Sequence, residues 1–241
     1  MSRIRADLLI VAKGLAESRA KARAAILAGG VRADGVAVSK PAELIEESAE
    51  LAVAPAHAWV SRGGVKLAHA LAAFAIDPAG KICLDIGAST GGFTQALLAA
   101  GAARVYAVDV GQGQLHASLR QDARVVSLER TDARVLTRAL IPQTPSLIVC
   151  DVSFIGAAKA LGVALTLAAE RADLVLLIKP QFEAGPNAGK GGVLAEDVAR
   201  VAGQAAIDAL DGLEGFRVVA AIDSPIRGGD GNLEILLHAQ R

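Results

Sequence analysis

From residue 81 onward, short apolar runs alternate with segments of helical pattern, and this alternation is the strongest constraint on the fold. The runs are KICLDIG, RVYAVDV, RVVSL, SLIVCDVSF and ADLVLLIKP. Strands that are apolar on both faces are typical of a parallel sheet covered by helices on each side. At the end, FRVVAAIDSPI and NLEILLHAQ are separated only by the turn-rich RGGDG, which predicts an antiparallel pair. The sequence therefore predicts an α/β fold with a mostly parallel sheet.

Residues 3–40 differ from the rest of the chain in charge, with eight basic and three acidic side chains. ADLLIVAKG predicts a short helix that ends at Gly14, and Ser18 is placed to cap a second helix. VRADGVAV then predicts two short strands joined through Asp34-Gly35. A helix–helix–hairpin of this size buries little core alone, so we expect a small module beside a larger domain.

We expect the module in residues 1–54, a linker over 55–64 and the α/β domain over 65–241. The 25 basic and 25 acidic residues cancel, so any nucleic-acid-binding surface must be local. No Cys or His pair has metal-ligand spacing, so we expect no metal site. Because there is neither a signal peptide nor an apolar run of membrane length, we expect a cytoplasmic protein that does not enter membranes.

The loop LDIGASTGGFT connects the first apolar run to the next helical pattern. Gly87 would allow a tight turn, and Gly91 and Gly92 would let a ligand approach the start of the helix. Asp109 ends the second run, 22 residues after Gly87, where a carboxylate can accept the hydroxyls of a ribose. The alternative is a glycine-rich turn of the kind found in any α/β sheet.

Asp85, the acidic residue in this stretch, indicates what kind of ligand the loop can bind. A dinucleotide fingerprint would need glycine in place of Ser89, and Asp85 would repel a pyrophosphate. A carboxylate suits a cationic ligand such as the amino-acid and sulfonium portion of S-adenosylmethionine. Asp132 follows the third run, where the adenine edge is expected. The remaining residues that we assign to this cofactor site are Thr90, Phe93, Val110 and Asp151.

At this point the chain resembles the TlyA family, and more broadly the FtsJ-type ribose 2′-O-methyltransferases, over essentially its whole length. Residues 3–40 resemble the RNA-binding module first seen in a small-subunit ribosomal protein, through GLAESRAKARAAILAGGVRADGVAVSKP. The remainder resembles the methyltransferase through SRGGVKL, LDIGASTGGFT, DVSF, LIKPQFEAG and GNLE. The resemblance implies a Rossmann-like class I methyltransferase with a mostly parallel seven-stranded sheet, preceded by a small α+β RNA-binding domain.

FtsJ-type enzymes carry a Lys-Asp-Lys-Glu tetrad, which the resemblance places on Lys66, Asp151, Lys179 and Glu234. A lysine can remove the proton of a ribose hydroxyl only when its pKa is lowered by burial and a nearby cation. Lys179 follows the apolar strand and is the candidate base, with Lys66 as the nearby cation that also steadies the developing oxyanion. Asp151 and Glu234 would orient the amines. The negative charges of Asp151 and Glu234 raise the pKa of a lysine and so oppose the effect of Lys66, and which effect is larger stays open. Taken singly, such lysines are ordinary surface groups.

The resemblance implies methyl transfer from S-adenosylmethionine to cytidine 2′-hydroxyls of large-subunit ribosomal RNA, and in some members of small-subunit RNA. Longer, dual-specificity members extend further at both ends, which favours large-subunit RNA here. The expected partner is ribosomal RNA or a ribosomal subunit, with no metal and no membrane, and the oligomeric state stays open. The family's other name, haemolysin, does not match any pore-like feature of the sequence. Two alternatives remain: the same chemistry on another structured RNA, or a binding or assembly factor without turnover.

Basic side chains in both parts of the chain are candidates for RNA contacts. In the module they are Arg3, Arg5, Arg19, Lys21, Arg23 and Arg32. In the larger domain, Arg62 could contact a phosphate or only support its own turn. Lys190 lies in the glycine-rich loop EAGPNAGKGGVLAED, which we interpret either as a flap beside the RNA or as a plain surface loop.

Overall fold

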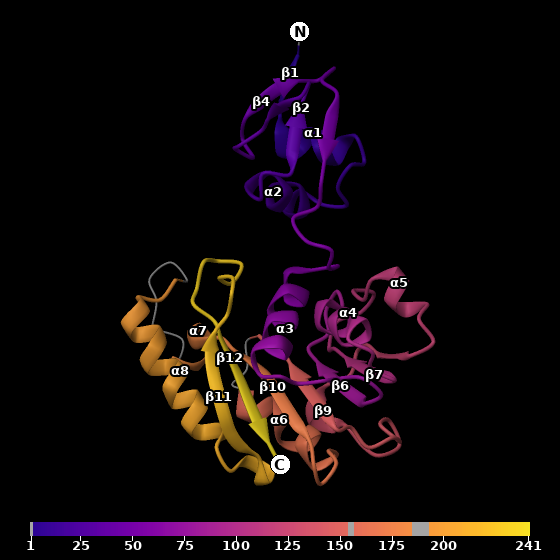
Figure 1. Ribbon diagram of the computed structural model, residues 1–241, viewed down its shortest axis with the longest axis vertical. Coiled ribbons are helices and arrows are strands. Elements are labelled where there is room, and N and C mark those ends of the chain that lie inside the picture. Colours follow the sequence, from indigo (N-terminus) through magenta and orange to yellow (C-terminus); the bar gives the residue numbers. More distant parts are fainter. Residues whose placement is uncertain (1, 154–156, 185–192) are drawn as a thin grey trace. The chain divides into compact units, whose positions relative to one another are not determined.

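The computed structural model describes residues 2–153, 157–184 and 193–241. Its contacts divide the chain into two compact units, Met1–Ala58 and Trp59–Arg241, which we call the first and second units (Figure 1). Trp59 already packs against a core of the second unit, and a helix begins at Arg62. The division between the two units therefore falls inside the range 55–64 that we expected to be a linker.

The first unit is a small α+β structure with its own core. Strand β2 (Val31–Ala33) pairs with β3 (Val36–Ala37) and β5 (Leu51–Val53), and β1 (Arg3–Arg5) pairs with β4 (Leu44–Glu46). Helices α1 (Ala6–Ala12) and α2 (Arg19–Leu27) supply much of the core. The expected helices and hairpin are confirmed. Residues 44–53, for which the sequence predicted no strand, add β4 and β5 to the unit.

Local contacts explain the ends of these elements. The Ser18 side chain accepts the backbone N–H of Lys21 and so caps α2 as predicted. Asp34 and Gly35 adopt positive φ values of 49° and 80°, which the short hairpin between β2 and β3 requires. The sequence of this unit therefore determines its turns locally.

A buried carboxylate, Asp7, ties the start of α1 to α2. Its side chain is fully buried and accepts hydrogen bonds from Arg5 and from the Nε of Arg19 at 2.8 Å. The Arg5 guanidinium holds the pKa of Asp7 well below its usual range. Buried charges are stable only when paired, so these two arginines have a structural role.

The second unit is built on a seven-stranded sheet in the order β11-β12-β10-β9-β6-β7-β8. Only the pairings of β12 with its two neighbours are antiparallel. The predicted fold class is confirmed. The strands are β6 (Ile82–Ile86), β7 (Arg104–Val108), β8 (Val125–Leu128), β9 (Leu147–Cys150), β10 (Asp173–Ile178), β11 (Arg217–Asp223) and β12 (Ile235–Gln240).

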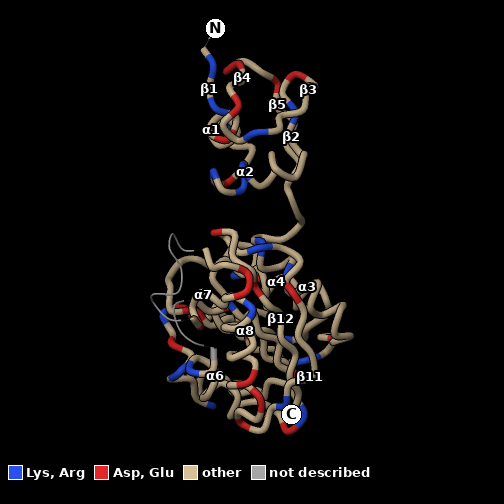
Figure 2. Tube along the Cα trace, turned by 90° about the vertical axis from the view of Figure 1, so that its left-hand side faces the viewer, with Lys and Arg blue, Asp and Glu red and all other residues tan. Residues whose placement is uncertain are grey.

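Helices cover both faces of this sheet, which is why its central strands are apolar throughout (Figure 1). One core includes α6 (Ala157–Thr166) and α8 (Glu196–Leu210), and the other includes α3 (Arg62–Ala73) and α4 (Gly92–Ala99). The shorter helical elements are α5 (Ala117–Arg120), α7 (Pro180–Glu183), η1 (Ala133–Val135) and η3 (Leu213–Gly215). Acidic and basic residues are interspersed along the trace of both units (Figure 2). Within the part of the chain that is described, no helix is long and apolar enough to span a membrane.

The strand directions bring four predicted site residues to one edge of the sheet. The parallel strands β9 and β10 end at Cys150 and Ile178, so Asp151 and Lys179 follow at their carboxyl ends. Strand β12 runs the opposite way and pairs Ile235 with Ile178, so Glu234 begins it at this same edge. The fourth residue, Lys66, comes from α3. Ligands of α/β sheets bind at carboxyl edges of this kind.

The buried ion cluster of the first unit gives a prediction. We expect Asp7→Asn to increase hydrogen exchange of residues 4–53 in the full chain, after correction for intrinsic rates, because both arginines lose their partner. The lowered pKa means that the stabilisation is present above about pH 4, the usual carboxyl value, and is lost as the pH falls. The difference from wild type should therefore shrink in acid. Glu17→Gln, which removes the exposed partner of Lys21, is the control. Equal protection in both variants at neutral pH would contradict the assignment.

Candidate active site

The larger of two adjoining cavities lies beside the glycine loop. It has a volume of about 590 Å³, and its walls come from the ends of β6, β7 and β9 together with η1. Its lining includes the predicted residues Gly87, Ser89, Asp109, Val110, Asp132 and Asp151. Apolar walls with a few placed polar groups are typical of a small-molecule site.

The glycine loop is held in place by backbone geometry and by Asp109. Gly87 has a φ of +80°, and a Cβ there would collide with the carbonyl oxygen of Asp151. Asp109 accepts the backbone N–H of Ser89 at 2.8 Å and that of Gly111 at 2.7 Å. The carboxylate that we expected to bind a ribose therefore also fixes the loop that would face the same ligand.

The other two glycines are required by the protein's own packing. Gly91 has a φ of +95°, and a Cβ there would strike the side chains of Leu119 and Leu115. At Gly92 a Cβ would strike Ser61. Gly92 lines the smaller cavity but Gly91 lines neither, so close approach of a ligand does not explain Gly91.

Asp85 lies beneath the loop and outside the lining of both cavities. Its side chain is fully buried, its Oδ2 accepts the Thr94 hydroxyl at 2.6 Å, and its Oδ1 has no hydrogen-bond partner among the described residues. Burial raises the pKa of Asp85 to about 7, with Asp151 adding repulsion. A buried acceptor without a partner is free to receive a donor from a ligand or a bridging water.

Asp132 caps η1 at the rim of the larger cavity. It accepts the backbone N–H of Arg134 at 2.9 Å and forms an ion pair with its guanidinium at 2.5 Å. These hydrogen bonds lower the pKa of Asp132 to about 2. The carboxylate is thus charged and held at the cavity wall, with an arginine that sequence analysis did not single out.

The smaller cavity, of about 280 Å³, is the more polar of the two. It is lined by Lys66, Asp151 and Lys179 of the predicted tetrad. The predicted Thr90, Gly92, Phe93 and Arg62 line it as well, together with Ser61 and Ser153. Gly87, Ser89, Asp151 and Ser153 line both cavities. The two cavities therefore share walls, and Asp151 of the tetrad lies where they meet, with Lys66 and Lys179 in the smaller cavity.

Two lysine–carboxylate pairs form the polar centre of this site. Lys66 is buried and forms an ion pair with the buried Glu234. Lys179 Nζ lies 2.6 Å from Asp151 Oδ1 and donates to the Ser153 hydroxyl at 2.8 Å. Each ammonium thus has a carboxylate beside it. The structure brings together all four members of the predicted tetrad.

The glycine-rich turn before β12 lies against the buried Lys66–Glu234 pair. A Cβ at Gly228 would come within 2.9 Å of Glu234 Oε1, and one at Gly229 within 3.3 Å of an Arg62 nitrogen. The turn RGGDG, which we used only to predict an antiparallel connection, therefore closely approaches the side chains of Glu234 and Arg62. Its glycines allow that approach.

The basic residues expected to bind RNA divide into paired and unpaired side chains. In the first unit Arg3 pairs with Glu46, Lys21 with Glu17, and both Arg5 and Arg19 with Asp7. Arg32 donates to the carbonyl of Gly35. Arg23 is exposed, and the described residues give it no ion pair. Lys190 lies outside the described residues.

One residue that lines the larger cavity, and the carboxylate that anchors it, were not predicted from the sequence. Gln114 is in the larger cavity and accepts the hydroxyl of Ser89 at 3.1 Å. Glu129 accepts the backbone N–H groups of Gly113, Gln114 and Leu115, and so fixes the turn that presents Gln114. The position of Gln114 shortly after Asp109 was the available signal. The anchor at Glu129 could not be identified without the fold.

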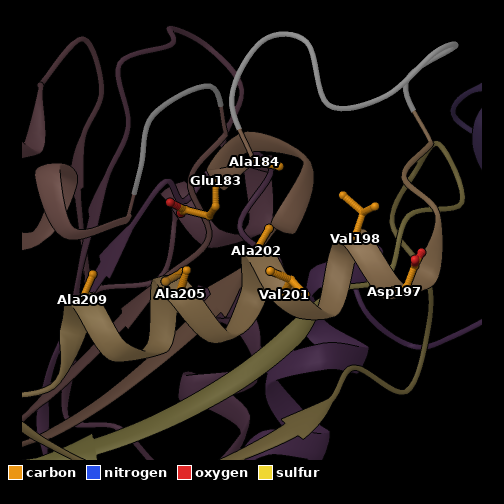
Figure 3. A pocket seen from close by; sticks show the side chains of 9 residues that line it. Glu183, Ala184, Asp197, Val198, Val201, Ala202, Ala205 and Ala209 are labelled. Carbon is orange, nitrogen blue, oxygen red and sulfur yellow. The ribbon is translucent and has the colours of Figure 1, made fainter.

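A third hollow lies away from these residues, along α8. It has a volume of about 580 Å³ and is lined mainly by alanine and valine side chains, with Glu183 and Asp197 as its ionisable groups. Figure 3 shows Val198, Val201, Ala202, Ala205 and Ala209 on this face of α8. None of the described residues that line it is basic, so this lining offers no counterpart to the tetrad.

Comparison with known proteins agrees with these observations. Residues 59–241 match the family described as FtsJ-like methyltransferase, and residues 4–51 match the S4 domain. The chain is 47% identical over 238 residues to the 16S/23S rRNA (cytidine-2′-O)-methyltransferase TlyA of Mycobacterium tuberculosis, covering 98% of this chain and 89% of that protein.

Two further relatives extend the comparison. The chain is 44% identical over 238 residues to a putative rRNA methyltransferase, YqxC, of Bacillus subtilis, covering 97% of this chain and 84% of that protein. A solved structure described as a putative hemolysin from Streptococcus thermophilus superposes with a TM-score of 0.73 at 39% identity, covering 100% of this chain and 89% of that one.

The buried Asp85 gives a prediction about pH. Its folded pKa is raised from the usual 3.8 to about 7, so the unfolded chain ionises first and stability falls between those values as the pH rises. We expect Asp85→Asn, which cannot ionise, to gain stability relative to wild type from pH 4 to pH 7 and then to level off. The largest expected change in the difference of unfolding free energy is roughly 4 kcal/mol, because each unit of pKa shift corresponds to about 1.4 kcal/mol. Denaturant unfolding of both proteins across this range measures it. The control is Asp208→Asn, at an exposed position on α8, whose difference in stability from wild type should not change with pH. A pH-independent difference for Asp85→Asn would contradict the assignment.

Proposed function

The chain belongs to the TlyA family of FtsJ-like methyltransferases, and we propose that it transfers a methyl group from S-adenosylmethionine to the 2′-hydroxyl of a cytidine in ribosomal RNA. The observation that carries the proposal is the position of the two lysine–carboxylate pairs: Lys66, Lys179 and Asp151 line the smaller, polar cavity, and Asp151 also lines the larger one. A transfer reaction needs donor and acceptor sites that meet at one point, with ionisable groups there.

The larger cavity fits the methyl donor. Its volume of about 590 Å³ lies within the range typical of small-molecule sites, about 300–1,000 Å³. Asp109 and Gln114 face it with groups that can hydrogen-bond a ribose, and Asp132 stands at its rim. Asp85 lines neither cavity, so we assign it no direct contact with the donor. When bound, S-adenosylmethionine supplies an electrophilic methyl group on a sulfonium and leaves as a neutral thioether.

The smaller cavity supplies the groups that act on the ribose. As the neutral amine, Lys179 Nζ accepts the proton of the 2′-hydroxyl, and the adjacent Asp151 carboxylate stabilises the ammonium that forms. Lys66 places a positive charge at the same cavity wall, where the oxygen gains negative charge. Glu234 holds the Lys66 amine in place.

The RNA side of the site rests on positive groups outside the tetrad. Arg62 lines the smaller cavity with an exposed side chain, in position to contact a phosphate beside the target nucleotide. The first unit matches the S4 domain, and its unpaired Arg23 is a candidate phosphate contact. We propose ribosomal RNA or a ribosomal subunit as the partner, with large-subunit RNA among the substrates.

Label transfer tests the activity. With methyl-labelled S-adenosylmethionine and each isolated ribosomal subunit, we expect wild type to label large-subunit RNA. Lys179→Ala should lower the rate at least 100-fold, because the proposed proton acceptor is lost. Lys81→Ala is the matched control: Lys81 also forms an ion pair, with Asp173 at 2.8 Å, but immediately before β6, at the opposite edge of the sheet. It should keep nearly full activity.

The outcomes separate the competing functions. Absence of label on RNA from either subunit and on protein-free RNA, with wild type, would favour a binding or assembly factor and overturn the proposal. Equal rates for wild type and Lys179→Ala would remove Lys179 as the proton acceptor.

Salt dependence tests the first unit's role. A protein that releases counterions from RNA loses affinity linearly in log–log plots against salt concentration. We expect Arg23→Ala to reduce the slope by the amount that corresponds to about one phosphate contact. Arg217→Ala, which removes an exposed arginine on β11, should leave the slope unchanged. Binding to isolated subunits between 50 and 200 mM salt, roughly the range over which such slopes are resolved, measures this. An unchanged slope for Arg23→Ala would exclude the contact.

A further inference from the structure

Lys179 has a second polar neighbour that the tetrad does not include. Its Nζ donates to the hydroxyl of Ser153 at 2.8 Å and lies 2.6 Å from Asp151 Oδ1. Both partners follow β9, and Lys179 follows the parallel neighbour β10. The amine is thus bracketed by two groups from a single strand end, one charged and the other neutral.

The two partners restrict which way the amine can face. Besides its carbon, an amine nitrogen has three positions for hydrogen or a lone pair. Ser153 takes one of these through a hydrogen bond, whereas the Asp151 carboxylate attracts the amine by charge and Asp151 Oδ1 makes no hydrogen bond among the described residues. Lysine amines rotate freely on long stems, so Ser153 is the neighbour that selects a direction for the amine at the wall of the cavity that Lys179 lines.

Ser153 does this without changing the charge of the site. A hydroxyl oxygen accepts an N–H of the amine before and after the proton moves, whereas a second carboxylate would add a negative charge beside the developing oxyanion. Ser153 also lines both cavities, so it stands where donor and acceptor must meet. A small side chain leaves that junction open.

The location of Ser153 argues against a packing role. It is partly exposed and belongs to neither core of the second unit, and Lys179 is the only hydrogen-bond partner of its hydroxyl within the described ranges. We propose that Ser153 is a positioning residue, which fixes the direction of the Lys179 amine for proton transfer. This inference rests on the proposed function.

Steady-state kinetics test it. We expect Ser153→Ala to lower kcat about 10- to 100-fold, the size of effect that misplacing a reacting group produces, with KM for both substrates within about twofold of wild type. Ser153→Thr keeps the hydroxyl and should recover most of the loss. The control is Ser224→Ala, whose hydroxyl donates to the carbonyl of Ile226 away from both cavities; it should behave as wild type.

A double variant separates positioning from other roles. If Ser153 acts through Lys179, then adding Ser153→Ala to Lys179→Ala should lower the single-turnover rate less than about twofold further, because coupled residues are not additive. Carbon relaxation at the Cε of Lys179, which needs no turnover, should show faster motion in Ser153→Ala than in wild type.

The failures are distinguishable. A wild-type protein that labels no RNA overturns the proposed function, with or without Ser153. An active wild type and an equally active Ser153→Ala overturn only the positioning role. A full additional loss in the Lys179→Ala background, or a rise confined to KM for S-adenosylmethionine, would show that Ser153 acts independently of Lys179, and would overturn it too.

Discussion

Charges buried at the edge of an apolar sheet must be paired, and this constraint organises the second unit. Strands β9, β10 and β12 are buried and nearly devoid of polar residues, yet the positions at their shared edge carry Asp151, Lys179 and Glu234. Either lysine alone would be costly to bury there. Lys66 enters from α3 to meet Glu234, and Lys179 meets Asp151, so each pair joins two separate elements. Stability and the proposed chemistry thus depend on the same contacts.

The same edge connects the two cavities through the backbone. Gly87, at the end of β6, approaches the carbonyl of Asp151 so closely that no side chain fits between them. Asp109, from the end of β7, holds the glycine loop through the backbone N–H of Ser89 and the turn after β7 through that of Gly111. The glycine loop in the wall of the larger cavity is therefore held in a fixed position relative to Asp151, which lines both cavities. Preorganisation of this kind is what group transfer requires.

Much of this could be predicted because the signals are local. Apolar runs gave the strands, Ser18 and Asp34-Gly35 gave the turns, and strand ends gave the positions of Asp151 and Lys179. What could not be predicted depends on contacts between distant segments. The structural role of Arg5 and Arg19 requires knowing that Asp7 is buried, and the need for glycine at position 91 comes from Leu115 and Leu119. The two strands within residues 44–53 are only three residues long each, too short to be recognised until β1 and β2 pair with them.

The central claim is that the oxygen of a cytidine ribose is the acceptor, and the chemical identity of the product tests it most directly. Large-subunit RNA labelled by the wild-type protein can be digested completely to nucleosides and separated by chromatography with mass detection. The account predicts that the label is in 2′-O-methylcytidine. Label in a base-methylated nucleoside, or in the ribose of a different nucleoside only, would contradict it.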